Sequence, residues 1–249
     1  MTSDSPSTAS LPSQLDIWQE TLAWQPTPAQ QDQFQTLYAY ILDANQHVNL
    51  TRITEPLDFW EKHLWDSLRG VAIGLASDAP ARVMDVGTGA GFPGLPLAIA
   101  RPDWDVTLLD STRKKIDVVQ AALPLLGLTN VTSMVGRVET LGHLPTHREQ
   151  YDWVLLRAVA SVATCAEYAL PLVKLGGQVV LYRGQWTAEE EQQLQAVARQ
   201  LGGAIAQVDA FETPITQGVR HSIYLTKVAA TPAAYPRAVG IPKQQPLLA

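Results

Sequence analysis

The sequence has a single cysteine, Cys165, among its 249 residues. One cysteine cannot form a disulfide within the chain, and it excludes a metal site built from several thiolates. Long apolar runs are also missing, because no stretch reaches the roughly 18 residues that a membrane-spanning helix needs. The first residues lack the basic and apolar segments of an export signal. We therefore expect a cytoplasmic protein with no membrane partner, stabilised by its own hydrophobic core.

Lysine and arginine are absent from residues 1–51, which contain five acidic side chains. The rest of the chain carries 18 basic and 19 acidic residues, so most of the net charge of −6 arises near the N-terminus. Nucleic-acid-binding domains usually show a basic excess. The composition therefore does not indicate a nucleic-acid partner, although it is compatible with a locally basic face.

Composition and apolar periodicity divide the chain into four regions. The Ser/Thr/Pro-rich residues 1–13 predict a disordered tail. Apolar residues recur at helical spacing over 15–23 and 28–45, and a third helix is expected from Thr54, as its cap, to Leu68. We expect a helical cap over residues 14–75, a main domain over 76–230, and an extended, proline-rich tail over 231–249.

Strand-like and helix-like segments alternate from Arg82 onward. Such alternation with short connections predicts a parallel sheet covered on both faces. Two further strand-like segments, separated by an irregular loop, predict an antiparallel hairpin at one edge. The expected strands are 82–86, 106–109, 131–135, 153–156 and 178–182, then 204–211 and 221–228 for the hairpin; the expected helices are 112–126, 162–175 and 188–201.

The most informative motif is the glycine-rich segment DVGTGAGF, which begins at Asp85. Gly87, Gly89 and Gly91 permit a sharp turn and the close approach of a ligand. A dinucleotide site favours G-x-G-x-x-G, but the third glycine position of that pattern is Phe92 here. G-x-G-x-G after an acidic residue suits S-adenosylmethionine, whose amino-acid end is cationic and which carries no phosphate. A purely structural turn and an NAD site are the alternatives.

Two later strand ends add acids that suit this cofactor. The second strand ends in Asp110, 25 residues after Asp85, where a carboxylate can accept hydrogen bonds from ribose hydroxyls. The third strand is followed by Val138 and Glu139, which can meet the adenine edge. From the spacing alone, Glu139 is equally consistent with a solvated acid in a loop.

The end of the fourth strand, LLRAVA, bears on the methyl acceptor. Methyltransferases that act on nucleic-acid amines usually carry an Asn/Asp-Pro-Pro-aromatic motif at this position. This strand end lacks that motif. Methylation of pyrimidine C5 requires a cysteine nucleophile, and Cys165 is better interpreted as a packing residue in an apolar helix. An acceptor that is nucleophilic when neutral, such as guanine N7, needs no general base, so we assign no catalytic residue. Arg157 is expected to hold the cofactor or a phosphate, with a structural salt bridge as the alternative.

His63, Asp66 and Ser67 lie at helical spacing on one face. A hydrolase triad is rejected, because its members come from separate elements with an oxyanion hole. Two ligands are too few for a metal site. We interpret the three residues as a polar helix face that caps or lines the cofactor pocket. Possible RNA contacts, for which a solvated surface is the alternative, are Arg113, Lys114, Lys115, Arg183, Arg220 and His221.

Six segments together resemble the RsmG (GidB) family: NLTRI from Asn49, HLWDS from His63, DVGTGAGFPG from Asp85, LDS from Leu109, RAVA from Arg157 and YPR from Tyr235. The resemblance implies a Rossmann-like α/β fold of the class I SAM-dependent methyltransferases, with a mostly parallel seven-stranded sheet, a C-terminal antiparallel hairpin and the N-terminal helical cap. It also implies methylation of N7 of guanine 527 in the 530 loop of 16S ribosomal RNA, with the small ribosomal subunit as partner. We expect a monomer.

The resemblance also assigns cofactor contacts by position. They fall on Gly87, Phe92, Asp110, Ser111, Thr112, Val138, Glu139 and Arg157, to which the residue patterns add Asp85, Gly89 and Gly91. Two rival functions stay open. A SAM enzyme with a small-molecule substrate is consistent with the pI of about 5.3 and the absence of a dense basic run. The other rival is a non-catalytic RNA-binding or ribosome-assembly protein that has kept the methyltransferase fold without the activity.

Overall fold

The computed structural model describes residues 10–248. Seven strands form one sheet in the order β3-β2-β1-β4-β5-β7-β6. The first five strands are mutually parallel, and β7 runs antiparallel to both β5 and β6. The sheet and its C-terminal hairpin are as expected. The strands are β1 (Arg82–Val86), β2 (Asp105–Asp110), β3 (Val131–Val135), β4 (Tyr151–Arg157), β5 (Val173–Arg183), β6 (Gly203–Glu212) and β7 (Val219–Lys227).

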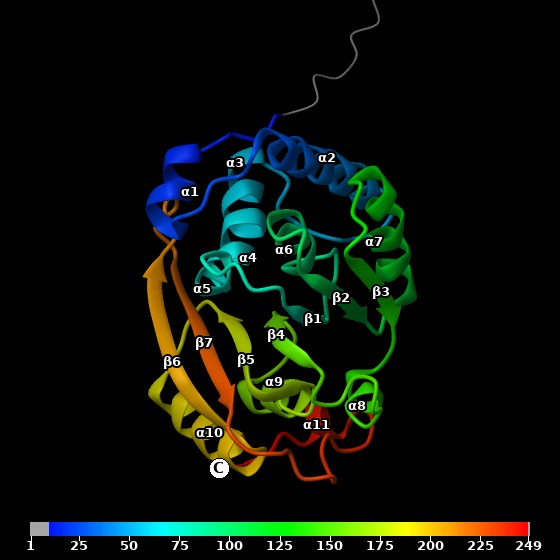
Figure 1. Ribbon diagram of the computed structural model, residues 1–249, viewed down its shortest axis with the longest axis vertical. Coiled ribbons are helices and arrows are strands. Elements are labelled where there is room, and N and C mark those ends of the chain that lie inside the picture. Colours follow the sequence, from blue (N-terminus) through cyan, green and yellow to red (C-terminus); the bar gives the residue numbers. More distant parts are fainter. Residues whose placement is uncertain (1–9, 249) are drawn as a thin grey trace, which may run out of the picture.

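Helices cover both faces of the sheet (Figure 1). One face carries α1 (Leu15–Leu22), α2 (Pro28–Asn45), α3 (Pro56–Phe59), the π-helix η1 (Trp60–Trp65), α4 (Asp66–Arg69), α5 (Ala72–Leu75), α6 (Gly94–Ala100) and α7 (Arg113–Leu125). The other carries α8 (Val138–Leu141), α9 (Val162–Ala169), α10 (Ala188–Gln200) and α11 (Ile241–Gln244). Each helical layer packs its own apolar core against the sheet. The central strands are buried on both faces, which explains their nearly continuous apolar sequences.

The N-terminal helices begin where local sequence favours it, with one exception. Thr27 accepts a hydrogen bond from the backbone of Gln30, whose side chain bonds back to the Thr27 N–H, and Pro28 occupies the first turn of α2. The expected cap at Thr54 is wrong, because α3 begins after Glu55 without a side-chain cap. The Thr54 carbonyl instead accepts a hydrogen bond from the Tyr38 hydroxyl.

The expected helix over 162–175 is too long. The structure ends α9 at Ala169 and begins β5 at Val173, which pairs with Tyr151 of β4. Pro171 explains the early end, because proline has no N–H to continue a helix and disfavours helical geometry in the residue before it. The apolar residues after Pro171 therefore form strand rather than helix.

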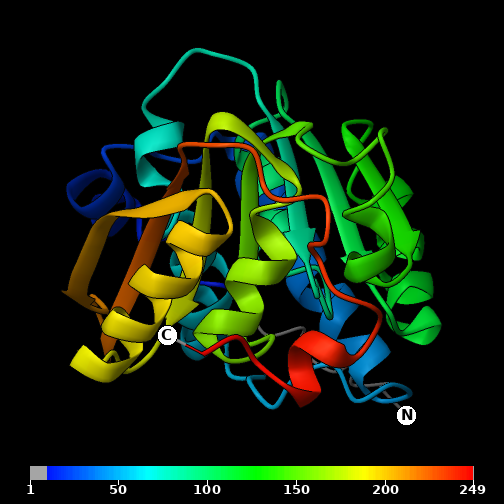
Figure 2. The same ribbon diagram turned by 90° about the horizontal axis from the view of Figure 1, so that it is seen from below.

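Both chain ends differ from the expected tails. The sequence predicts a disordered tail over residues 1–13, of which residues 1–9 lie outside the described residues. At Leu11, the N–H donates to the Gln35 side chain, and the Leu11 side chain packs against the core. The C-terminal tail is not simply extended, because it contains α11 and crosses the face formed by α9 and α10 (Figure 2). Arg237 fixes it there through an ion pair with the fully buried Glu167 at 2.7 Å. None of the helices between residues 10 and 248 is long and apolar enough to cross a bilayer.

Candidate functional site

A pocket of about 570 Å³ opens where the parallel strands end. Its walls come from the segments that follow β1, β2, β3 and β4, together with α9 and the C-terminal tail. Ligands of open α/β sheets bind at this edge. The lining side chains are those of Val86, Leu109, Asp110, Ser111, Arg137, Val138, Glu139, Val159, Ala160, Tyr168 and Lys243, with backbone from Gly87 and Gly136.

Asp110 connects the glycine-rich turn to this pocket. One carboxylate oxygen accepts a hydrogen bond from the Gly89 N–H at 3.1 Å, and the other accepts from the Thr112 N–H at 2.8 Å. The backbone thereby fixes the carboxylate, which retains further acceptor capacity on both oxygens. A carboxylate held at the end of β2 is suited to two neighbouring ribose hydroxyls. Ser111 lines the pocket beside it, whereas Thr112 contributes only its backbone to this arrangement.

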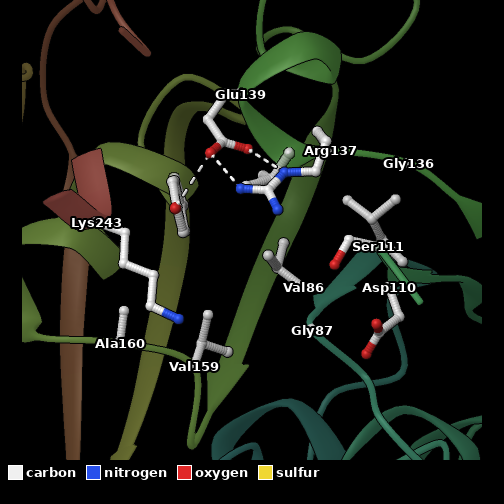
Figure 3. Close-up of a pocket in the computed structure, with 13 residues that line it drawn as sticks. Val86, Gly87, Asp110, Ser111, Gly136, Arg137, Glu139, Val159, Ala160 and Lys243 are labelled. Atoms are coloured by element: carbon white, nitrogen blue, oxygen red, sulfur yellow. Dashed lines mark hydrogen bonds and ion pairs between the residues drawn. The ribbon is translucent and has the colours of Figure 1, made fainter. Parts of the chain in front are cut away.

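Glu139 is a pocket acid and not a solvated loop acid. It is 2% exposed and forms an ion pair with Arg137 at 2.8 Å. The Tyr168 hydroxyl and the Gly240 N–H also donate to it, at 3.3 and 3.0 Å. Figure 3 shows Arg137 and Glu139 paired at the rim of the pocket. Burial alone would raise the pKa of Glu139, but the hydrogen bonds from Arg137 and the backbone lower it overall. The carboxylate therefore stays charged and can accept a hydrogen bond from an amino group such as that of adenine.

Asp85 does not line the pocket, contrary to the expectation that it meets the cofactor directly. It is fully buried, and its Oδ2 accepts hydrogen bonds from the Thr88 hydroxyl at 2.6 Å and the Gly94 N–H at 2.9 Å. These bonds close the glycine-rich turn onto the start of α6. Its Oδ1 has no hydrogen-bond partner within residues 10–248. Burial raises the pKa of Asp85 to about 6. Its role in the structure is to shape the turn.

The glycines of the turn differ in what surrounds them. A Cβ at Gly91 would overlap the Leu95 side chain, and one at Gly87 would stand 2.8 Å from Val159. A Cβ at Gly89 would meet nothing closer than the Gly87 carbonyl oxygen at 3.9 Å. Gly89 thus faces open space beside two pocket-lining residues, whereas Gly91 is required by packing. The turn fits a ligand that lies against the Gly89 backbone.

Phe92 and Arg157 also lie outside the pocket, in a buried cluster around His63. The Phe92 ring stacks on His63 with centroids 4.4 Å apart, and the Arg157 guanidinium lies 5.6 Å from the Phe92 centroid. Arg157 donates to the Lys62 carbonyl at 2.9 Å, to Asp66 Oδ2 at 3.3 Å and to His63 Nδ1 at 3.3 Å. Arg157 is therefore fixed outside the cofactor pocket, and Phe92 packs against His63 although the resemblance implies a cofactor contact for it.

The polar residues of the HLWDS segment lie in or beside this buried cluster, and their hydrogen bonds define their roles. Because arginine only donates, His63 Nδ1 must accept, and the proton on Nε2 is donated to Thr51 Oγ1 at 2.8 Å. Burial, with the positive charges of Arg157 and Lys62, lowers the pKa of His63 to about 3. The Ser67 hydroxyl donates to the His63 carbonyl of its own helix. The three residues form no relay, in agreement with the rejection of a triad.

A second, arginine-lined cavity lies on the other side of the turn after β4. Arg157, Arg183 and Arg220 line it, together with Asp66, Ala158 and Glu190. Ala158 adopts a left-handed backbone conformation with φ of 56°, which is uncommon for a residue other than glycine. Its neighbours Val159 and Ala160 line the first pocket. The turn at Ala158 is therefore the shared wall of the two cavities.

The expected RNA-binding residues fall into two groups at the same edge of the sheet. Arg113 and Lys114 are exposed and Lys115 is half-buried at the start of α7, directly after Asp110. Arg183 and Arg220 lie in the arginine-lined cavity, where Arg183 forms an ion pair with Glu190 at 2.5 Å. The remaining residue, His221, pairs with Arg183 across β5 and β7 and bonds to the Gly184 carbonyl.

Two pocket residues could not be found from sequence patterns. Tyr168 reaches Glu139 from α9, and Lys243 extends into the pocket from the C-terminal tail on the side opposite Asp110 (Figure 3). The only signal for Lys243 is the absence of acids in the tail. Cys165 is buried, and burial raises the pKa of its thiol to about 11, so it is no nucleophile. Within residues 10–248, no three acidic, histidine or cysteine side chains are grouped as a metal site requires.

Comparison with known proteins identifies the family. The model of the GidB family, described as rRNA small subunit methyltransferase G, matches residues 30–221. The chain belongs to this family. The ribosomal RNA small subunit methyltransferase G of Trichormus variabilis is 58% identical, over 95% of this chain and 98% of its own length. The protein of the same name from Synechococcus elongatus is 54% identical, over 94% and 97% of the two chains.

Solved structures agree with the methyltransferase fold. The 16S rRNA (adenine(1408)-N(1))-methyltransferase of Catenulisporales acidiphilia superimposes with a TM-score of 0.51 at 17% identity, covering 67% of this chain and 93% of that one. A SAM-dependent methyltransferase of Aquifex aeolicus gives 0.50 at 18% identity, covering 68% and 93%. Such low identities establish the fold alone. The fold and the family make S-adenosylmethionine the cofactor, and the fixed Asp110, the charged Glu139 and the open space at Gly89 fit it.

Proposed function

We propose that the chain transfers the methyl group of S-adenosylmethionine to N7 of a guanine in small-subunit ribosomal RNA, namely guanine 527 of the 530 loop. The observation that carries the proposal is the pair of cavities on either side of Ala158. One holds acids suited to a ribose and an adenine, and the other is lined by three arginines suited to RNA. The family membership supports ribosomal RNA as the substrate class.

The side chains present match an acceptor that needs no deprotonation. The cofactor, when bound, supplies an electrophilic methyl group on a sulfonium. Guanine N7 attacks through an in-plane lone pair that carries no proton, so the protein has alignment as its main task. In agreement, the Arg157 side chain is held by three acceptors and the only cysteine is buried as a neutral thiol. Asp110 and Glu139 would hold the ribose and adenine ends, which orients the cofactor toward the Ala158 turn.

The RNA must present its base outside a regular helix. Guanine N7 lies in the deep groove of A-form RNA, which side chains cannot enter, so the target base has to be unstacked. In this proposal Arg113 and Lys114 on one side and Arg220 on the other would contact the flanking phosphates. The nearly balanced charge beyond residue 51 favours weak binding to naked RNA and dependence on a folded ribosomal target. A monomer acting in the cytoplasm stays a prediction.

Methyl transfer from tritiated S-adenosylmethionine tests the proposal. We expect label in 16S rRNA or in small ribosomal subunits and none in unrelated RNA of equal length. Label on a free small molecule would favour the small-molecule enzyme instead. A protein that binds S-adenosylhomocysteine in a calorimetric titration but labels no RNA would contradict the assigned substrate. Failure to bind S-adenosylhomocysteine would indicate the non-catalytic alternative.

A further inference from the structure

The arginine-lined cavity contains one carboxylate that the fold does not fully use. Glu190 accepts from Arg183 through Oε1 and from the Thr187 N–H through Oε2, so both its oxygens have partners. Asp66 differs. Its Oδ2 accepts a single hydrogen bond from Arg157 at 3.3 Å, and the cation nearest to its Oδ1 is Arg220 Nε at 4.0 Å. Oδ1 accepts no hydrogen bond from any residue in the range 10–248.

This carboxylate is fixed and mostly shielded from solvent. The Asp66 side chain is 12% exposed, and it lines the cavity from α4. Glu190, which is already paired, is the other acid that lines this cavity. Arg157 holds it in place while being held itself by the Lys62 carbonyl and His63. Unlike Asp85 Oδ1, the Oδ1 atom of Asp66 is not fully enclosed, so its free acceptor capacity is open to the cavity. Such a group is suited to donors supplied by a ligand.

Guanine offers a matching pair of donors. Its N1–H and its exocyclic N2 amino group lie side by side on one edge, and N7 lies on the other side of the base. A carboxylate can accept from both donors with its two oxygens. Adenine has an acceptor at N1 and no amino group at C2, so it would leave the carboxylate unpaired and place an acceptor against it.

We propose that Asp66 determines base specificity by accepting hydrogen bonds from N1–H and the N2 amino group of the guanine. The proposal rests on the proposed function, because it assumes a base in the arginine-lined cavity. Arg157 is then the positioning residue that holds Asp66, while Arg183 and Arg220 on the cavity wall are available to O6 or to phosphate. The Ala158 turn leaves the opposite edge of the base on the side of the cofactor pocket.

The test compares analogues of the target base in two proteins. Small subunits are reconstituted with 16S rRNA that carries guanine, inosine or 2-aminopurine at the position that the wild type methylates. Inosine lacks only the N2 amino group, whereas 2-aminopurine lacks the N1 hydrogen together with O6; both keep N7. The wild type should lose about ten- to a hundredfold in kcat/KM with inosine, the loss expected for one hydrogen bond to a charged group, and at least as much with 2-aminopurine. Asp66→Ala should methylate guanine slowly and no faster than inosine.

Glu190→Gln is the matched control, because its carboxylate lies in the same cavity but is already paired. It should keep the wild-type preference for guanine over inosine. S-adenosylhomocysteine affinity, measured by calorimetry, should be unchanged in Asp66→Ala, since Asp66 lies outside the cofactor pocket. Where Asp66→Ala fails to fold, Asp66→Asn replaces it, and this variant should show a smaller preference for guanine over inosine than the wild type does.

Two results would overturn the proposal. A wild type that methylates guanine and inosine at equal rates does not read the N2 amino group. An Asp66→Ala protein that binds S-adenosylhomocysteine normally and still prefers guanine by the wild-type ratio reads the base through other groups. A wild type that methylates none of the three substrates contradicts the proposed function itself, which separates the two failures.

Discussion

Replacing Gly89 by alanine separates ligand binding from folding in the glycine-rich turn. Gly89 has φ of 61°, in the left-handed region that costs a residue with a Cβ about 1 kcal/mol. The new Cβ would have no close neighbour, since the nearest atom is the Gly87 carbonyl oxygen at 3.9 Å. For a chain of this size, a loss of about 1 kcal/mol lowers the melting temperature by roughly 2–4 °C. The variant should therefore fold.

Cofactor binding should suffer far more than stability in Gly89→Ala. The methyl group would occupy space beside Gly87 and Asp110, where the ligand approaches the backbone. We expect the affinity for S-adenosylhomocysteine to fall at least tenfold, which corresponds to about 1.4 kcal/mol. Calorimetric titration and thermal unfolding measure the two effects on the same protein.

Gly91→Ala is the opposite case and serves as the comparison. Its φ of 95° and the overlap of a Cβ with Leu95 combine backbone strain with overpacking, for a loss of about 2–5 kcal/mol. Its folded fraction should bind S-adenosylhomocysteine within about threefold of the wild type, because the added methyl group faces α6. Normal ligand affinity in Gly89→Ala, or equal affinity losses in both variants, would refute the assignment of the pocket.

Four further changes test individual contacts. Asp110→Asn should weaken S-adenosylhomocysteine binding in calorimetry and lower stability by about 1–3 kcal/mol, because the single amide oxygen cannot accept from both the Gly89 and Thr112 N–H groups and from the ribose hydroxyls; unchanged affinity in the folded variant would exclude the ribose contact. Arg237→Ala should lower the free energy of unfolding in urea by about 3–5 kcal/mol, because it removes the cation beside the fully buried Glu167 and leaves that carboxylate only the backbone N–H of residue 237, whereas Arg237→Lys should lose less. His63 has a folded pKa of about 3, below its ordinary 6.5, so the unfolded chain binds the extra proton and stability falls as pH drops from 6.5 toward 3. That dependence, up to about 1.4 kcal/mol per pH unit, should flatten in His63→Gln; identical urea curves against pH would contradict it. Cys165 should resist iodoacetamide at pH 8 until the protein is unfolded, since burial raises its pKa to about 11.

The sheet could be predicted from the sequence because its strands are local apolar segments bounded by glycine and polar residues. β1 and β3 have the predicted bounds, and the hairpin of β6 and β7 lies where alternation ended. The errors have local causes. Pro171 ended α9 early, and six residues of η1 adopted π-helical geometry that no propensity distinguishes from an α-helix.

The site could be predicted only as far as short-range motifs reach. Asp110 and Glu139 directly follow strands, so their positions at the sheet edge follow from topology. Lys243 reaches the same pocket from a tail whose path is set by Arg237 and Glu167, 70 residues apart in the sequence. The residue pattern predicts a ligand contact for Asp85 and the family resemblance implies one for Phe92, but the structure buries both side chains outside the pocket. Neighbourhood in sequence indicated the turn correctly without indicating which side chains face the cavity.

The identity of the methylated atom tests the account most directly. Small ribosomal subunits labelled by the enzyme can be treated with borohydride and aniline, which cleave RNA at N7-methylguanine. We predict that strand scission occurs at a single guanine and that the tritium label is released from the RNA in full, together with the methylated base that the treatment removes. Label that resists this cleavage, on an exocyclic amine or on a pyrimidine carbon, would contradict a site built for an acceptor that reacts without a base.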